Sequence, residues 1–217
     1  MKIAAAIIML LFCGSVSAQD QWKNIYSQRA WNERDKWQKA DELMRLLNIS
    51  SGSKVADVGC HEGYMTFKLA RVVGSTGTVY AVDVLQLRLD QVKKRADKSK
   101  LTQVKIVKGE FDDPKLPTAT LDAVIILDTY HEMDDHAEIL QHIKTSLKAG
   151  GRLLICDPIA ESRRGSSRSE QKKKHELAME YALEDLKEAG FTIAFQRDNF
   201  IDRTKEKGDK MWVVVAE

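Results

Sequence analysis

Short apolar runs alternate with longer amphipathic segments from about residue 51 to the end of the chain. Five runs have the length and the valine and isoleucine content of buried strands: Lys54–Val58, Thr78–Val82, Val104–Lys108, Leu121–Leu127 and Arg152–Cys156. The fourth run is almost continuously apolar, which is typical of a central parallel strand buried on both faces. Alternation of such strands with helices predicts an α/β domain with a doubly wound, Rossmann-like sheet and helices on both faces.

The segments between the strands carry apolar residues at helical spacing. They predict helices over Tyr64–Val73, Leu85–Lys98, Asp135–Leu147 and Glu170–Ala189. Asp135 and Glu138 have the spacing of a capping box in which aspartate replaces serine or threonine. The stretch 161–169 is rich in arginine and serine and has no apolar periodicity, so we expect a mobile loop there.

Both ends of the predicted domain carry additional elements. Residues 191–197 and 211–216 predict two strands, and the polar stretch 202–209 between them indicates an antiparallel hairpin. Residues 21–47 show helical periodicity and contain three tryptophans. A helix in this segment either packs against the core or also covers a ligand.

The first 18 residues have the order of a secretory signal peptide. Lys2 is followed by an apolar run from Ile3 to Phe12 and by small residues that end at Ala18. The run is shorter than the ~20 residues that span a bilayer, which argues against an uncleaved anchor. We therefore expect a secreted or periplasmic protein, without stable membrane insertion once residues 1–18 are removed. An N-terminal helical segment at 19–50 and one domain at 51–217 would remain.

The charge balance does not indicate a nucleic-acid or membrane partner. The chain has 34 Lys and Arg against 32 Asp and Glu, which is a formal net charge of +2. No pattern in the sequence indicates an oligomeric state.

The most informative stretch runs from Val55 to Gly63, followed by a second strand that ends at Asp83. A strand, a glycine-bearing loop, a helix and a second strand ending in an acid form a unit that holds an adenosine-type ligand. The loop lacks the dinucleotide pattern G-x-G-x-x-G, because only Gly59 and Gly63 are present. Asp57 precedes the loop, where it would repel a pyrophosphate and attract an ammonium group. A positively charged nucleoside therefore fits better than a nicotinamide dinucleotide.

Four segments in this order resemble the class I S-adenosylmethionine-dependent methyltransferases. They are the loop at 55–63 with Asp83, the stretch 109–117, the strand 122–128 and Leu147-Lys148-Ala149-Gly150-Gly151-Arg152-Leu153, which is close to that family's L-K-P-G-G-x-L turn. The resemblance covers roughly residues 50–217. It implies a seven-stranded sheet that closes with the antiparallel hairpin. In that fold Cys60 and Cys156 end strands that are not neighbours, so we expect both to be free thiols.

The resemblance also implies a cofactor, S-adenosyl-L-methionine, and a set of residues that bind it. By position in the family pattern these are Asp57, Gly59, Cys60, Gly63, Asp83, Val84, Glu110, Phe111, Asp112 and Asp128. Asp83 is expected at the ribose hydroxyls and Asp57 at the methionine amino group. Glu110 and the Phe111 backbone match the adenine side, with Asp112 as an alternative acid. The chain departs from the family at His61, which stands where the middle glycine is usual.

The segment Asp128–His136 follows the fourth strand and is expected to face the transferred methyl group. It superficially resembles the zinc pattern H-E-x-x-H, but the second histidine comes one residue late. The first His–Glu pair also lies at a strand end and not within a helix, so the two rings cannot share a helical face. We therefore expect no metal.

Acid–base chemistry is the alternative use of this segment. Methyl transfer to a hydroxyl needs a base, and His131 has a suitable unperturbed pKa. Glu132 or Asp128 can orient its imidazole, and Tyr130 and His175 are further candidates for the catalytic site. Tyr130 and His131 can equally be packing residues, and His175 can be a solvated helix residue.

The sequence as a whole predicts an exported methyltransferase that acts on a small or medium-sized acceptor, with oxygen favoured as the acceptor atom. An alternative is a module that binds an adenosine-type ligand without turnover, because export separates the protein from the cytoplasmic source of the methyl donor.

Overall fold

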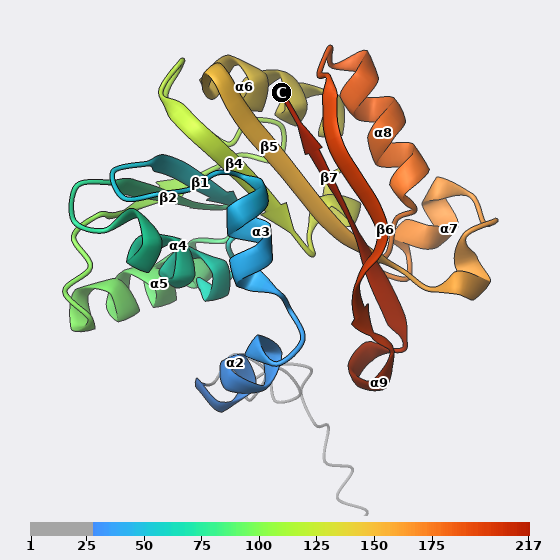
Figure 1. Cartoon of the computed structure of the whole chain (residues 1–217), viewed down its shortest axis with the longest axis horizontal. Helices are drawn as coiled ribbons and strands as arrows, with labels where there is room; N and C mark the ends of the chain where they lie inside the picture. Colours follow the sequence, from blue (N-terminus) through green and yellow to red (C-terminus); the bar gives the residue numbers. More distant parts are fainter. Residues whose placement is uncertain (1–27) are drawn as a thin grey trace, which may run out of the picture.

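The computed structural model describes residues 28–217, so the expected signal peptide at 1–18 lies outside the described residues (Figure 1). One seven-stranded sheet has the strand order β3-β2-β1-β4-β5-β7-β6. The strands are β1 (Lys54–Val58), β2 (Thr78–Asp83), β3 (Val104–Lys108), β4 (Leu121–Leu127), β5 (Leu147–Ile159), β6 (Ile193–Arg203) and β7 (Asp209–Ala216). The pairs among β1 to β5 are parallel, and β7 pairs antiparallel with both β5 and β6. The predicted doubly wound sheet with a closing hairpin is confirmed.

Helices cover both faces of the sheet. The helices are α2 (Gln28–Asp35), α3 (Ala40–Leu46), α4 (Tyr64–Val73), α5 (Gln86–Lys98), α6 (His136–Ser146), α7 (Arg168–Lys172), α8 (Met179–Glu188) and α9 (Thr204–Lys207). Alternate side chains of each strand point to opposite faces, so Val124 and Ile126 pack in one core cluster with α6 and α8. Ala123 and Ile125 pack in another with α3 and α4. Figure 1 shows these two helical layers on either side of the sheet.

The structure corrects two predicted helices. The segment 21–47 does not form one helix over its described part, because α2 and α3 are separated by a turn in which Lys39 has a φ of 51°. The expected helix Glu170–Ala189 is likewise divided into α7 and α8, and His175 between them has a φ of 57°. A residue in this left-handed conformation interrupts the helical hydrogen bonds, which hydrophobic spacing does not reveal.

Two local expectations are also wrong. Asp135 is the N-cap of α6 but makes no side-chain capping bond, so the capping box does not form. The stretch 161–169 is a folded segment that contains a 3-10 turn at Glu161–Arg163 and a capping box between Ser167 and Glu170. It is held in place by Gln171, whose buried side chain donates to three backbone carbonyls of the stretch and accepts from the Ala178 N–H.

The two cysteines within the described residues, Cys60 and Cys156, are buried and free, as predicted. None of the helices between residues 28 and 217 combines the length and apolar character that crossing a bilayer requires.

Candidate cofactor and acceptor site

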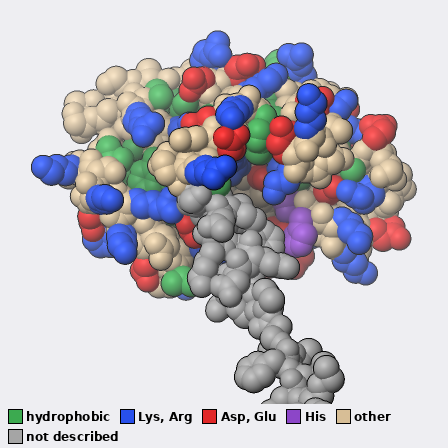
Figure 2. Space-filling view, turned by 90° about the horizontal axis from the view of Figure 1, so that it is seen from below, with side chains coloured by type: hydrophobic (Ala, Val, Ile, Leu, Met, Phe, Trp, Pro, Cys, Tyr) green, Lys and Arg blue, Asp and Glu red, His purple; other side chains and the backbone are tan. Residues whose placement is uncertain are grey.

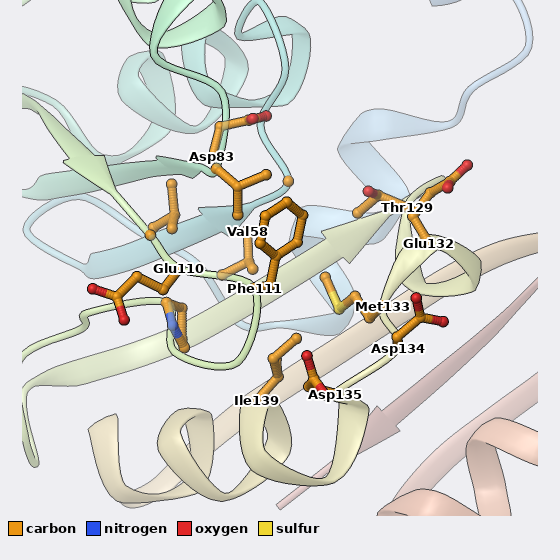
Figure 3. A pocket seen from close by; sticks show the side chains of 15 residues that line it. Val58, Asp83, Glu110, Phe111, Thr129, Glu132, Met133, Asp134, Asp135 and Ile139 are labelled. Carbon is orange, nitrogen blue, oxygen red and sulfur yellow. The ribbon is translucent and has the colours of Figure 1, made fainter.

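Two adjoining cavities open at the carboxyl ends of β1, β2 and β4, where ligands bind in doubly wound sheets. The smaller has a volume of about 280 Å³ and is shown in Figure 3. The larger has a volume of about 860 Å³ and reaches α2 and α9. They share six lining residues: Gly59, Asp83, Val84, Phe111, Thr129 and Glu132. The two cavities therefore form one site with a smaller and a larger chamber.

The loop after β1 depends on its glycines and tolerates one unusual residue. Gly59 and Gly63 have φ values of 76° and 93°. A Cβ atom at Gly59 would lie 2.4 Å from Cγ2 of Thr129, so only glycine fits there. His61 also has a positive φ, 49°, which costs a residue with a side chain about 1–2 kcal/mol.

Asp83 stands at the end of β2 and lines both cavities. Its two carboxylate oxygens accept from the backbone N–H groups of His61 and Leu85, each at 2.9 Å. Each oxygen can accept a second hydrogen bond. Asp83 therefore fixes the loop and can still accept from the hydroxyls of a ribose.

Asp57 is 2% exposed and lines the larger cavity. The Thr66 hydroxyl donates to its carboxylate at 2.6 Å. Burial raises the pKa of Asp57 to about 6, although hydrogen bonds from Thr66 and the charge of Arg34 act in the opposite direction. A buried carboxylate that is reluctant to ionise gains from a cation beside it. This environment and the cradle at Gly59 both fit a cationic nucleoside.

The predicted adenine side forms the smaller cavity. The Phe111 side chain is 74% exposed, and in Figure 3 its ring lies between Asp83 and Met133. An apolar ring left this exposed in a cavity offers a surface on which a flat base can stack. The Glu110 carboxylate points outward and pairs with Lys115 at 3.2 Å.

The structure brings most of the predicted cofactor residues to the two cavities. Those that line them are Asp57, Gly59, Cys60, Asp83, Val84, Glu110, Phe111 and Asp128. Gly63 and Asp112 line neither. Gly63 precedes α4 and shapes the loop, whereas Asp112 lies in the exposed turn after Phe111.

Asp128 follows the last residue of β4, lines the larger cavity and contacts the C-terminal hairpin. Its carboxylate accepts from Arg203 at 2.9 Å, and the same guanidinium binds Asp209. Burial opposes the ionisation of Asp128, but the charge of Arg203 outweighs it and lowers the pKa below its usual value. Arg203 was not anticipated, since no local pattern relates it to a residue 75 positions earlier.

The larger cavity has an aromatic wall, formed by Trp31, Trp37 and Tyr64. Arg34 lies among these rings, with its guanidinium carbon 4.2 Å from the centroid of Tyr64. Arg34 is a further lining residue that sequence reasoning missed. The only signal for this wall was the tryptophan content of residues 21–47, and Trp31 and Trp37 face the ligand chamber while also packing on the core.

The predicted catalytic residues have different positions. Tyr130 is fully buried and donates its hydroxyl proton to Asp185 at 2.8 Å, and it lines neither cavity. His131 is 5% exposed and lies behind Glu132, which lines both cavities. Glu132 therefore faces the ligand chamber in the place where His131 was expected.

A chain of polar contacts runs from the core to the surface through His131. Its backbone N–H and its Nδ1 both contact Oδ2 of the buried Asp157 at 2.9 Å. Nε2 lies 3.2 Å from Oε1 of Glu132, which also binds Nδ1 of His175. Burial opposes protonation of His131, but Asp157 outweighs it and raises the pKa of the imidazole.

Comparison with known proteins gives matches over most of the chain. A family model described as a methyltransferase domain matches residues 49–208. Demethylmenaquinone methyltransferase of Bacillus mycoides (strain KBAB4) is 27% identical over 138 residues, which are 64% of this chain and 57% of that protein. Its counterpart from Geobacillus sp. (strain WCH70) is 28% identical over 122 residues, 56% of this chain and 51% of that protein. The chain thus spans little more than half the length of these curated relatives.

Solved structures show the same fold. A SAM-dependent methyltransferase from Aquifex aeolicus matches with a TM-score of 0.69 and 23% identity, over 82% of this chain and 88% of that one. Geranyl diphosphate C-methyltransferase from Streptomyces coelicolor A3(2) matches with a TM-score of 0.67 and 15% identity, over 82% and 79%.

The family match, the strand order and the cavity at the carboxyl ends of β1, β2 and β4 lead to one assignment. The chain belongs to the class I S-adenosylmethionine-dependent methyltransferase family.

Proposed function

We propose that the protein methylates a hydroxyl oxygen of a small or medium-sized acceptor that carries an aromatic ring. The observation that supports this acceptor class is the larger cavity, whose wall holds Trp31, Trp37 and Tyr64. Aromatic walls favour flat apolar ligands, and the cavity volume of about 860 Å³ suits a molecule of that size.

S-adenosylmethionine supplies, when bound, an electrophilic methyl group on a cationic sulfur. In-line displacement forms the oxygen–carbon bond as the carbon–sulfur bond breaks, and it leaves S-adenosylhomocysteine. Alignment of the two reactants supplies much of the acceleration. Asp83 and Asp57 hold the donor side, and the aromatic wall positions the acceptor.

The proton of the acceptor hydroxyl needs a destination. Glu132 lines both cavities and lies 3.2 Å from Nε2 of His131. A proton taken up by Glu132 can therefore pass to His131. Asp157 stabilises the imidazolium that results, because its buried carboxylate binds Nδ1 at 2.9 Å.

Labelled methyl transfer tests this proposal. The protein is incubated with S-adenosylmethionine and a panel of phenols, catechols and reduced quinones. Quinones belong in the panel because the curated relatives are named demethylmenaquinone methyltransferases. The expected product carries the methyl group on oxygen, and a product methylated on carbon would contradict the choice of acceptor atom.

Substitution of the proton acceptor provides the matching test of mechanism. We expect His131→Ala to lower the transfer rate more than tenfold with unchanged affinity for S-adenosylmethionine. The control is His142→Ala, since His142 is half exposed on α6 and lines neither cavity. A wild-type rate in His131→Ala would make this histidine a packing residue.

We also propose that the protein works outside the cytoplasm, which rests on the composition of residues 1–18. The N-terminus of the protein recovered from the host tests it. A chain that begins at Gln19 supports export, and an intact chain confined to the cytoplasm contradicts it.

A further inference from the structure

Two histidines and a glutamate converge at the mouth of the site, although the sequence separates them. His131 and Glu132 belong to the 3-10 turn after β4, and His175 lies in the turn between α7 and α8. One ligand atom from each side chain lies within 4.8 Å of the others. A cation bound at about 2.0–2.2 Å holds its ligand atoms at most about 4.4 Å apart. Small rotations of the exposed Glu132 and His175 side chains would bring the three atoms to this spacing.

Asp157 orients the first of these ligands. Its buried carboxylate accepts from the His131 backbone N–H and contacts Nδ1, both at 2.9 Å. With a proton on Nδ1, the lone pair of Nε2 points toward Glu132 and away from the core. A metal-binding histidine almost always has such a carboxylate or carbonyl partner on its other nitrogen.

The partners of Glu132 differ from those of four other acids around it. Asp128 pairs with Arg203, Asp134 with Lys172, Glu176 with Arg163 and Asp185 with Arg168. Each of these carboxylates has a permanent cation beside it. The side-chain partners of Glu132 are two histidines, His131 and His175. Its carboxylate therefore lies between two nitrogen atoms that can also bind a metal ion.

The cluster is also accessible. The side chains of Glu132 and His175 are 53% and 74% exposed, whereas His131 is buried. Figure 2 shows histidine side chains at the surface on the side that carries α2 and α9, among charged side chains of both signs. An ion can therefore reach the three ligands from solvent, with Glu132 at the boundary of the cavity.

We propose that His131, Glu132 and His175 bind one divalent transition-metal ion, with Zn²⁺ as the representative ion. Two imidazoles and one carboxylate suit zinc and related ions, and three protein ligands leave a coordination position open for water or substrate. The sequence led to the opposite expectation, because His175 lies 43 residues from Glu132 and no local spacing relates them.

A bound ion changes the part that His131 plays. Its imidazole then holds the cation, and the cation promotes loss of the acceptor proton, which leaves to solvent. This use of the ion rests on the proposed function, whereas metal binding itself does not.

Calorimetric titration of the chelator-treated protein with Zn²⁺ tests the metal site in the absence of cofactor and acceptor. Co²⁺ serves as a second probe, since its visible absorption reports the number and type of ligands. We expect one equivalent to bind with micromolar or tighter affinity. We expect His175→Asn to weaken binding at least tenfold, and asparagine tolerates the left-handed conformation at φ 57°.

Two further variants separate a built site from general attraction. Asp157→Asn removes the negative charge beside His131 and keeps the size of the side chain at position 157. We expect the affinity for the metal ion to fall about tenfold or more. His142→Ala removes an exposed histidine outside the cluster, and its affinity should equal that of the wild type. The proposal would be overturned if Zn²⁺ did not bind stoichiometrically, or if His175→Asn and His142→Ala lost the same affinity for Zn²⁺. S-adenosylmethionine binding is measured on the same samples, so failure of the metal site does not affect that result.

Discussion

At the scale of single residues, the end of β1 and the loop after it hold two side chains, Asp57 and His61, whose pKa values lie far from their usual range. Burial raises the pKa of Asp57 to about 6. Burial, with the positive charges of Arg88 and Arg34, lowers the pKa of His61 to about 4. His61 is therefore neutral at pH 7, whereas Asp57 begins to take up a proton just below neutrality. At pH 7 the loop therefore carries no positive charge from His61, and the ionised carboxylate of Asp57 can bind a cationic ligand.

The pKa of Asp57 makes cofactor affinity depend on pH. A cation binds the ionised carboxylate, so the affinity for S-adenosylmethionine is nearly full at about pH 7 and falls as the pH decreases through about 6. Between pH 7 and pH 5 we expect a loss of roughly tenfold, because about one unit below its pKa only about a tenth of the group is ionised. Calorimetric titrations with S-adenosylmethionine at several pH values measure this.

Asp57→Asn is the matched variant for that titration. This variant should bind S-adenosylmethionine more weakly than the wild type at pH 7. Its affinity should also change little between pH 5 and pH 7. His61 does not contribute in this window, because it titrates near pH 4. Equal pH dependence in the two proteins would show that another group controls binding.

At the scale of elements, the C-terminal hairpin is joined to the carboxyl end of β4 by one side chain. Arg203, at the end of β6, is 4% exposed and contacts both Asp128 and Asp209. Without it, two carboxylates in or beside the core lose their partner. Between the two strands of the hairpin, α9 lines the larger cavity through Glu206 and Lys207. The contact of Arg203 with Asp128 thus joins this wall of the cavity to the end of β4.

We expect Arg203→Met to destabilise the protein by about 3 kcal/mol, because removal of one partner from a buried ion pair leaves uncompensated charge. Urea unfolding followed by circular dichroism measures the change in the free energy of unfolding. Arg197→Ala is the control, since Arg197 lies on the same strand and is exposed. A difference below about 1 kcal/mol between the two variants would contradict a structural role for this ion pair.

At the scale of the whole molecule, the sequence predicts the sheet better than the site. The bounds of β1, β3 and β4 agree with those expected from the sequence. For the central strand β4 the reason is that a parallel strand buried on both faces needs a nearly continuous apolar run. The break between α7 and α8 was missed, since apolar spacing continues across it. There the buried side chain of Gln171 and the left-handed His175 decide the local structure.

The cofactor side of the site could be located because its residues follow strands in a recognisable order. The acceptor side could not, because its contacts join distant parts of the chain. Glu132 meets His175 across 43 residues, and Arg203 meets Asp128 across 75. Only folding brings such pairs together. The sequence therefore identifies histidines that are candidates for the catalytic site, but it does not predict their contacts.

Calorimetric titration of the purified protein with S-adenosylmethionine, S-adenosylhomocysteine and NAD tests the assignment of the whole molecule most directly. The cationic donor fits the buried Asp57, and Asp83 remains able to accept from its ribose. We expect micromolar binding of S-adenosylmethionine and S-adenosylhomocysteine, and no binding of NAD. Binding of NAD alone, or of none of the three, would contradict the account of this cavity as a methyl-donor site.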